Sequence, residues 1–291
     1  MTDTDKLLKR LDGLLDRVEK MLPDQFEIST EPGYCAYRWS ARGLDGISQY
    51  DQVDKSELLH LERQQNLLLR NTAQFLDNKD ANNALLWGAR GTGKSSLIKA
   101  QLNEFKDRGL CIVEIPKAAT GELFDVIRHL ASDGRKFIIY LDDLSFEAND
   151  DSYKALKACL EGSLQLQPDN VIIYATSNRR HLMPESMQDN LDSTMVDGQL
   201  HPSDSIEEKI SLSDRFGLWL SFYPFRQDAY LQVAQHWVSV LADQTKLEAP
   251  WGEEARAEAP RWALARGVRS GRTAQHFARY WVGRLALGET V

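Results

Sequence analysis

The segment Gly88–Ser95, which reads Gly-Ala-Arg-Gly-Thr-Gly-Lys-Ser, constrains this chain more than any other feature. It fits the pattern of glycine, four residues and Gly-Lys-Ser, in which the glycines let backbone N–H groups point inward at phosphates. Lys94 offers a charge to the β- and γ-phosphates, and Ser95 offers a hydroxyl ligand to magnesium. The residues predicted to form this phosphate-binding loop are Gly88, Ala89, Arg90, Gly91, Thr92, Gly93, Lys94, Ser95 and Ser96.

Apolar runs and helix-length segments alternate after this loop. Strands are predicted at 84–87, 111–115, 136–141, 171–175 and 218–222, and helices at 95–105, 122–131 and 151–164. Strands separated by helices need crossover connections, so this pattern predicts a parallel sheet that helices cover on both faces. The loop then follows a strand and opens a helix, and the helix N-terminus adds to the anion site.

The two ends of the chain have helical rather than strand patterns. Residues 5–22 place leucines three and four positions apart, which predicts a helix. Residues 24–55 contain the glycines and proline typical of irregular structure. A second helix is predicted over 56–76. Toward the C-terminus the segments 228–242, 253–266 and 272–287 have helical spacing without strand alternation, which predicts a small helical domain.

Charge limits the classes of partner. Lys and Arg number 35 against 43 Asp and Glu, a net charge of −8, which argues against a surface that binds nucleic acid everywhere. Residues 251–291 nevertheless hold seven Arg and four Glu, so the overall charge does not exclude a local basic patch. Residues 184–209 hold seven acidic residues and one Lys, and we interpret them as a mobile, solvated insertion.

Other features point to a cytoplasmic protein. The three cysteines lie far apart and have no metal-ligand spacing. Apolar stretches are far shorter than the ~20 residues needed to cross a bilayer. The first ten residues lack an apolar signal core, so we expect a cytoplasmic location and no membrane partner.

A second motif follows the strand at 136–141. The apolar run ends in Asp142 and Asp143, and such a strand beside the loop can present Asp142 to magnesium. Asp143 then lies where a carboxylate can orient the attacking water. The structural alternative is a strand end whose acidic residues only begin a turn.

Together these motifs resemble an AAA+ ATPase. The strand at 171–175 runs into Thr176-Ser177-Asn178-Arg179, and the resemblance implies that Asn178 is the first sensor, which helps to hold the water near the γ-phosphate. It also implies that Arg215, in Leu212-Ser213-Asp214-Arg215-Phe216, reaches the nucleotide of a neighbouring subunit. Arg269 matches the second sensor, with Arg272 as the substitute candidate. Leu61, in Leu59-His60-Leu61, matches the segment that lines the adenine pocket.

Over residues 35–285 the pattern is similar to a bacterial AAA+ family known as domain of unknown function 815. The resemblance implies a P-loop NTPase fold whose strands, numbered along the chain, have the order 5-1-4-3-2. It divides the chain into an N-terminal helical extension (1–55), an AAA+ nucleotide-binding domain (56–226) and a helical lid domain (227–291). It implies ATP and Mg²⁺ as cofactors and a homo-oligomer, either ring or filament, acting on an unknown protein client.

Three functions follow as hypotheses. The first is an ATPase that acts at subunit interfaces to remodel or move its client, with Lys94, Asp143, Asn178 and Arg215 as catalytic residues. The second is a nucleotide-gated switch with slow turnover, because most AAA+ proteins have Glu where this chain has Asp143; Glu147 is a possible substitute. The third is a nucleic-acid remodeller or loader that uses the Arg-rich lid, which the charge balance does not favour. Phosphoryl transfer to a small molecule is a further, less favoured option.

Overall fold

The computed structural model describes residues 33–146, 151–161, 168–180, 182, 194–196, 199–201, 212–247 and 251–288. Three features of the sequence lie outside these residues: the helix predicted over 5–22, most of the acidic segment 184–209, and Glu147. Within the acidic segment, β7 (Thr194–Val196) and β8 (Gln199–His201) form a short antiparallel pair.

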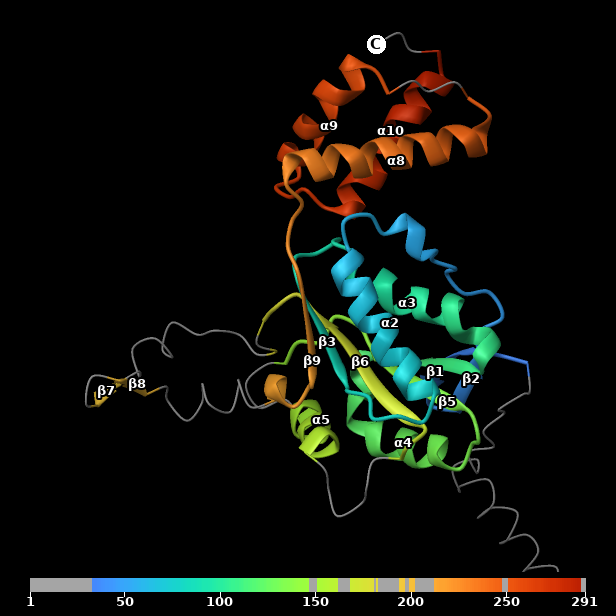
Figure 1. The fold of residues 1–291 in the computed structure, drawn as a ribbon, viewed down its shortest axis with the longest axis vertical. Helices are drawn as coiled ribbons and strands as arrows, with labels where there is room; N and C mark the ends of the chain where they lie inside the picture. Colours follow the sequence, from blue (N-terminus) through green and yellow to red (C-terminus); the bar gives the residue numbers. More distant parts are fainter. Residues whose placement is uncertain are drawn as a thin grey trace, which may run out of the picture.

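A seven-stranded sheet forms the centre of the molecule, in the order β2-β1-β4-β5-β6-β3-β9 (Figure 1). Every neighbouring pair is parallel except β1 and β2. The strands are β1 (Ala36–Ser40), β2 (Gly43–Gly46), β3 (Ala84–Gly88), β4 (Leu110–Glu114), β5 (Lys136–Leu141), β6 (Val171–Ser177) and β9 (Leu218–Phe222). The five strands predicted from the sequence are present, and their order, β9-β3-β6-β5-β4, confirms the predicted 5-1-4-3-2.

The prediction of irregular structure over 24–55 is wrong for residues 36–46. They form the hairpin β1–β2, and β1 extends the sheet by pairing with β4. The cause is packing: Tyr37 and Trp39 are 1% and 2% exposed and enter the core. Strands of five and four residues carry little periodic signal, so the sequence pattern did not predict them. The sheet therefore begins N-terminal to residue 56.

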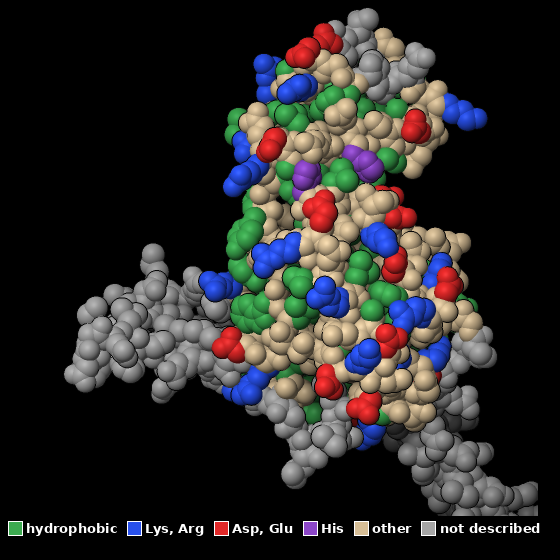
Figure 2. Space-filling model, in the orientation of Figure 1, with side chains coloured by type: hydrophobic (Ala, Val, Ile, Leu, Met, Phe, Trp, Pro, Cys, Tyr) green, Lys and Arg blue, Asp and Glu red, His purple; other side chains and the backbone are tan. Residues whose placement is uncertain are grey.

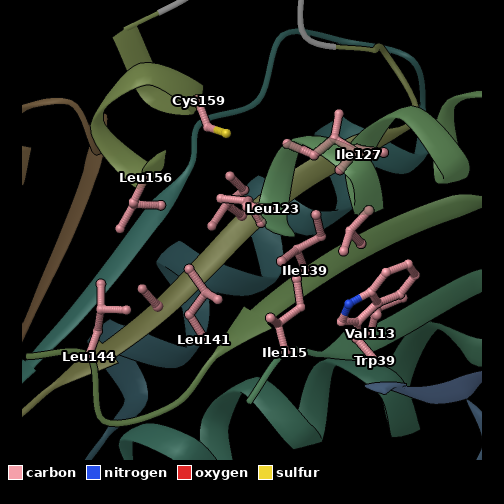
Figure 3. Packing of buried hydrophobic residues seen from close by; sticks show 14 of the residues in the cluster. Trp39, Val113, Ile115, Leu123, Ile127, Ile139, Leu141, Leu144, Leu156 and Cys159 are labelled. Carbon is pink, nitrogen blue, oxygen red and sulfur yellow. The ribbon is translucent and has the colours of Figure 1, made fainter. Parts of the chain in front are cut away.

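Helices cover both faces of the sheet, as predicted. The helices α2 (Glu62–Leu76) and α3 (Lys94–Phe105) lie on one face (Figure 1). On the other face lie α4 (Leu123–Ala131) and α5 (Asp151–Glu161). Because side chains alternate along a strand, Ile138 of β5 packs under the first pair and Ile139 under the second. Figure 3 shows Ile139 among the aliphatic residues of this second layer.

The helix predicted over 56–76 is shorter than expected. Lys55–Glu57 forms a single 3₁₀ turn (η1), and α2 begins only at Glu62. Between them His60 has a φ of 62°, a left-handed conformation that ends any helix. Two further 3₁₀ turns, η2 (Lys106–Arg108) and η3 (Lys117–Glu122), precede β4 and α4.

The predicted helical domain is present above the sheet (Figure 1). It consists of α8 (Gln227–Thr245), α9 (Glu253–Ala265) and α10 (Gly271–Ala286). Buried alanines from all three helices let their backbones approach closely around Tyr230, Phe277 and Trp281. Across the described residues, no helix combines the length and apolar character that a bilayer crossing requires.

Candidate nucleotide site

The predicted phosphate loop connects β3 to α3 at the carboxyl edge of the sheet. Gly88 has a φ of 134°, and a Cβ there would lie 1.9 Å from the carbonyl oxygen of Phe222. Only glycine fits where β3 passes β9 so closely. The loop is closed by two hydrogen bonds: Ala89 N donates to the Phe222 oxygen at 3.0 Å, and Thr92 Oγ1 donates to the Ala89 oxygen at 2.7 Å.

Lys94 turns back over this loop from the first turn of α3. Its Nζ donates to the carbonyl oxygens of Gly88 and Ala89, each at 2.8 Å, and to Asn178 Oδ1 at 3.1 Å. Lys94 is 7% exposed. Burial of the ammonium group lowers the pKa of Lys94 to about 8, against the attraction of Asp143 and Asp142. A phosphate arriving here would therefore meet a cation that lacks a full counter-charge.

Ser95 and Asp142 meet beside the loop. Ser95 Oγ donates to Asp142 Oδ1 at 2.8 Å, and Thr176 Oγ1 donates to the same oxygen at 2.6 Å. Burial by itself would raise the pKa of Asp142, but the hydrogen bonds, that from Thr176 foremost, hold this pKa below its usual value. The carboxylate thus stays ionised next to a hydroxyl.

This pair of oxygen ligands fits magnesium. Mg²⁺ prefers hard oxygen donors and is usually bound through one or two carboxylates together with substrate phosphates and water. The described residues contain no cluster of three or more His, Cys, Asp or Glu that could enclose a metal by themselves. A cation held by Ser95 and Asp142 would depend on the phosphates for its remaining ligands.

Asp143 and Asn178 complete the network from neighbouring strand ends. Asn178 Nδ2 donates to Asp143 Oδ1, while Asn178 Oδ1 accepts from Lys94. Asp143 has a φ of 49°, and its backbone N donates to Thr176 Oγ1 at 2.9 Å. The left-handed backbone turns the Asp143 side chain toward Asn178, so the predicted water-orienting residue and the predicted sensor lie in direct contact.

The lid closes the upper side of a cleft of about 580 Å³ over these residues. Arg272 N donates to the Gly91 oxygen at 3.1 Å, and a Cβ on Gly91 would lie 2.8 Å from Arg272 Cβ. Leu61, which the resemblance assigns to an adenine pocket, lines the cleft together with Leu58 and Leu59. Figure 2 shows histidines where the lid meets the sheet domain. The cleft therefore has a polar floor, an apolar side wall and a helical cover.

The two candidate lid sensors differ in position. Arg272, at the start of α10, lines the cleft, but Arg269 does not belong to its lining. Arg269 is exposed, and its carbonyl oxygen accepts from Phe225 N at 2.8 Å, which fixes the hinge between β9 and α8. The geometry therefore favours Arg272 over the predicted Arg269 as the residue that faces a bound nucleotide.

Arg215 also lies outside the cleft lining of its own chain. It follows a short helical turn anchored by buried Leu212 and Phe216, and Trp219 Nε1 donates to the Ser213 oxygen at 3.0 Å. These contacts present Arg215 at the surface. This is the placement required of a residue that serves a neighbour's site.

Thr176 belongs to this network, although the sequence did not single it out. It is 1% exposed, and its hydroxyl donates to Asp142 while accepting from the Asp143 backbone. A polar residue near the end of a buried strand, two positions before Asn178, was the available signal. The pairing itself depends on β6 lying next to β5, which the motif does not encode.

The protein-family comparison decides the family. A model described as "Protein of unknown function (DUF815)" matches residues 33–285. The chain belongs to the DUF815 family. This confirms the resemblance predicted over 35–285. A search of curated protein sequences gives no match to this DUF815 chain.

Solved structures confirm the fold. A mutant of RuvB from Thermotoga maritima has a TM-score of 0.56 at 14% identity and covers 82% of this chain and 67% of its own. The ORC1 protein of Aeropyrum pernix, solved in complex with DNA, has a TM-score of 0.53 at 17% identity and covers 82% and 65%. The DUF815 chain thus spans about two thirds of these relatives. It has the AAA+ P-loop fold, a parallel sheet flanked by helices with a C-terminal helical region.

Proposed function

We propose that this DUF815 protein binds Mg-ATP in the cleft and hydrolyses it to ADP and phosphate. One observation carries the proposal: Thr176 joins two hydrogen-bonded groups beside the loop into a single network. These groups are Ser95 with Asp142, and Lys94 with Asn178 and Asp143. A network that only stabilised the fold would not need a glycine loop, a buried lysine and a carboxylate–hydroxyl pair together at three adjacent strand ends. Phosphoryl transfer needs all of them, because its catalysis is mainly positioning and charge stabilisation.

Each residue then has a defined task. Lys94 and the loop N–H groups hold the β- and γ-phosphates, and Ser95 and Asp142 hold the cation. Bound magnesium would neutralise charge on the β- and γ-oxygens. Asp143 accepts a hydrogen bond from the attacking water and orients it in line with the γ-phosphate, and Asn178 fixes the Asp143 carboxylate.

We propose further that the site is completed by a neighbouring subunit. Arg215 lies at the surface on an anchored turn and outside the cleft of its own chain, which suits an arginine that stabilises the transition state in trans. The resulting assembly would be a homo-oligomer, a ring or a filament. Closing the lid on ATP and reopening it after hydrolysis would move a protein client in the cytoplasm.

A second candidate is a nucleotide-gated switch with slow turnover. Asp143 is one methylene shorter than glutamate, and its carboxylate is already engaged by Asn178. Water must compete for this carboxylate, so hydrolysis would be slow while ATP binding remains intact. Assembly with a partner would then depend on which nucleotide is bound.

Steady-state ATP turnover per subunit, measured against protein concentration, tests the proposal. We expect a rate that rises and then saturates as neighbours complete the sites. Lys94→Met and Arg215→Ala should each be inactive, yet a mixture of the two should recover turnover, because one supplies an intact site and the other an intact arginine. No recovery would remove Arg215 from the mechanism. A flat, near-zero rate with tight ATP binding would favour the switch.

A further inference from the structure

The second half of the lid has an unusual charge pattern. Residues 259–288 contain six arginines and one histidine but no Asp, Glu or Lys, in a chain with a net charge of −8. A balanced surface mixes both signs, so 30 residues without one acidic side chain need an explanation. The exclusive use of Arg is informative as well, because guanidinium groups bind phosphates in a bidentate manner and stack on planar rings.

Three of these arginines and the histidine lie along one side of α10: Arg272, His276, Arg279 and Arg284. Exposed residues of this side follow one another from the cleft outward, at Arg272, His276, Arg279, Tyr280 and Leu287. The twelve helical rises from Arg272 to Arg284 span about 18 Å.

Aromatic rings lie between the arginines. The Trp262 and Tyr280 rings stack with their centroids 4.6 Å apart and an interplanar angle of 25°. The Arg266 guanidinium lies 3.4 Å from the centroid of Trp262, and the Arg284 guanidinium lies 5.5 Å from that of Tyr280. Arg266 therefore covers the Trp262 end of a stack of two rings, whereas Arg284 donates a hydrogen bond to the Tyr280 hydroxyl at 3.2 Å. Tyr280 is 36% exposed and Arg266 is exposed, so planar surfaces face the solvent.

Few acidic groups neutralise this surface. Glu258 of α9 contacts Arg284 at 3.5 Å, at one end of the stack. Within the described residues, Arg279 has no ion pair, whereas Arg38, Arg108 and Arg128 of the sheet domain are each paired with a carboxylate. Figure 2 shows both basic and acidic side chains along the α9 edge of the lid.

We propose that this surface, which consists of Arg266, His276, Arg279, Tyr280 and Arg284, binds a single strand of nucleic acid. The arginines contact the phosphates, and unpaired bases stack on the exposed planes of Tyr280 and Arg266. An acidic peptide would satisfy the charges but would leave the stacked rings without a role. The first turn of α10 contacts the phosphate loop through the hydrogen bond from Arg272 N to the Gly91 oxygen. The bound nucleic acid would therefore lie on the helix that closes the nucleotide cleft.

Fluorescence anisotropy of a labelled 20-nucleotide oligo(dT) with the full-length protein tests the proposal. We expect binding at low salt that weakens as the NaCl concentration rises. A plot of the logarithm of the association constant against the logarithm of the salt concentration should have a slope of about −2 for three arginine–phosphate contacts. The triple variant Arg266→Gln, Arg279→Gln and Arg284→Gln should lower the affinity about tenfold or more and bring the slope near zero. Tyr280→Leu should weaken binding but keep the slope, because it removes a ring and no charge.

The matched control is the triple variant Arg38→Gln, Arg108→Gln and Arg128→Gln, which removes the same charge from paired arginines. It should leave the affinity unchanged. No binding at 25 mM salt, equal losses in both triple variants, or equal competition by poly-glutamate would overturn the proposal. Loss of the oligomer in the lid variant would instead assign this face to subunit contact. ATP turnover of the lid variant without nucleic acid should equal that of wild type, so the result is separate from the proposed ATPase.

Discussion

The two sides of the nucleotide cleft are held in opposite ways. On the sheet side, the side chains of Lys94, Ser95, Thr176 and Asn178 bond to one another and to the carboxylates. On the lid side, the described contact to the loop is made by backbone, from Arg272 N to the Gly91 oxygen. Chemistry is thus pre-organised on the rigid sheet, whereas the lid can move without dismantling the catalytic groups.

The cores of the sheet domain and of the lid also differ, in the size of the residues that fill them. The sheet core contains large aliphatic and aromatic residues, such as Ile139 and Phe137, that fix the strand ends. The lid core is built on small alanines from three helices around a few large rings. Because the strand ends are fixed in a close-packed core, their polar groups keep the precise positions that catalysis needs. Four substitutions or conditions would break or sharpen this comparison.

Removing the cation from the sheet side should have the largest effect. Lys94→Met keeps the length of the side chain but takes away the charge that faces the phosphates. We expect kcat/KM for ATP to fall by about a hundredfold or more, the size seen when a transition-state donor is removed. Steady-state turnover measures it, and Lys79→Met, at an exposed lysine outside the cleft, is the control. Unchanged turnover would remove Lys94 from the mechanism.

Thr176→Val tests whether the network is pre-organised. It removes the donor to Asp142 and leaves the half-buried Asp143 N–H without its acceptor. We expect the free energy of unfolding to fall by about 1–3 kcal/mol and the pKa of Asp142 to rise. Urea unfolding and the magnesium dependence of turnover measure the two effects. Thr176→Ser keeps the hydroxyl, so it should retain most of the stability and most of the lowering of the Asp142 pKa. Equal losses in the two variants would show that packing alone matters.

The pH dependence of ATP binding should report the buried ammonium of Lys94. Its pKa is about 8 without nucleotide, and the triphosphate favours the charged form, so binding above pH 8 takes up a proton. The apparent affinity should therefore fall by about tenfold per pH unit above this value. Titration calorimetry at pH 8.5 should give enthalpies that differ between Tris and phosphate buffers. At pH 6.5 the difference should vanish, and its persistence there would assign the proton to another group.

The lid side should show the smallest effect and separate the two sensor candidates. Arg272→Gln removes an exposed charge that lines the cleft, so ATP affinity should fall by about three- to tenfold. Arg269→Gln should leave the affinity near that of wild type, because its side chain lies outside the cleft. Binding of a fluorescent ATP analogue measures both. The reverse ranking would restore Arg269 as the sensor that the sequence predicts.

Much of the fold was predictable because its signals are local. The buried strands are unbroken apolar runs such as Phe137–Leu141, and the loop has a fixed spacing of glycines before Lys94. The hairpin β1–β2 was missed because its two strands are short and become strands by pairing with β4 and with each other. The left-handed residue His60, which delays the start of α2, has no sequence signal of its own.

The sequence by itself determined the class of chemistry. Glycine spacing, Lys94, Ser95 and the acidic residues after an apolar strand specify a phosphate site and its sheet, because backbone conformation and residue type are local properties. Tertiary structure decided which groups touch: Thr176 bridges Asp142 and Asp143, and Arg272 rather than Arg269 faces the cleft. These contacts join residues more than 30 positions apart. They depend on strand order and helix rotation, which follow from the packing of the whole core rather than from any one segment.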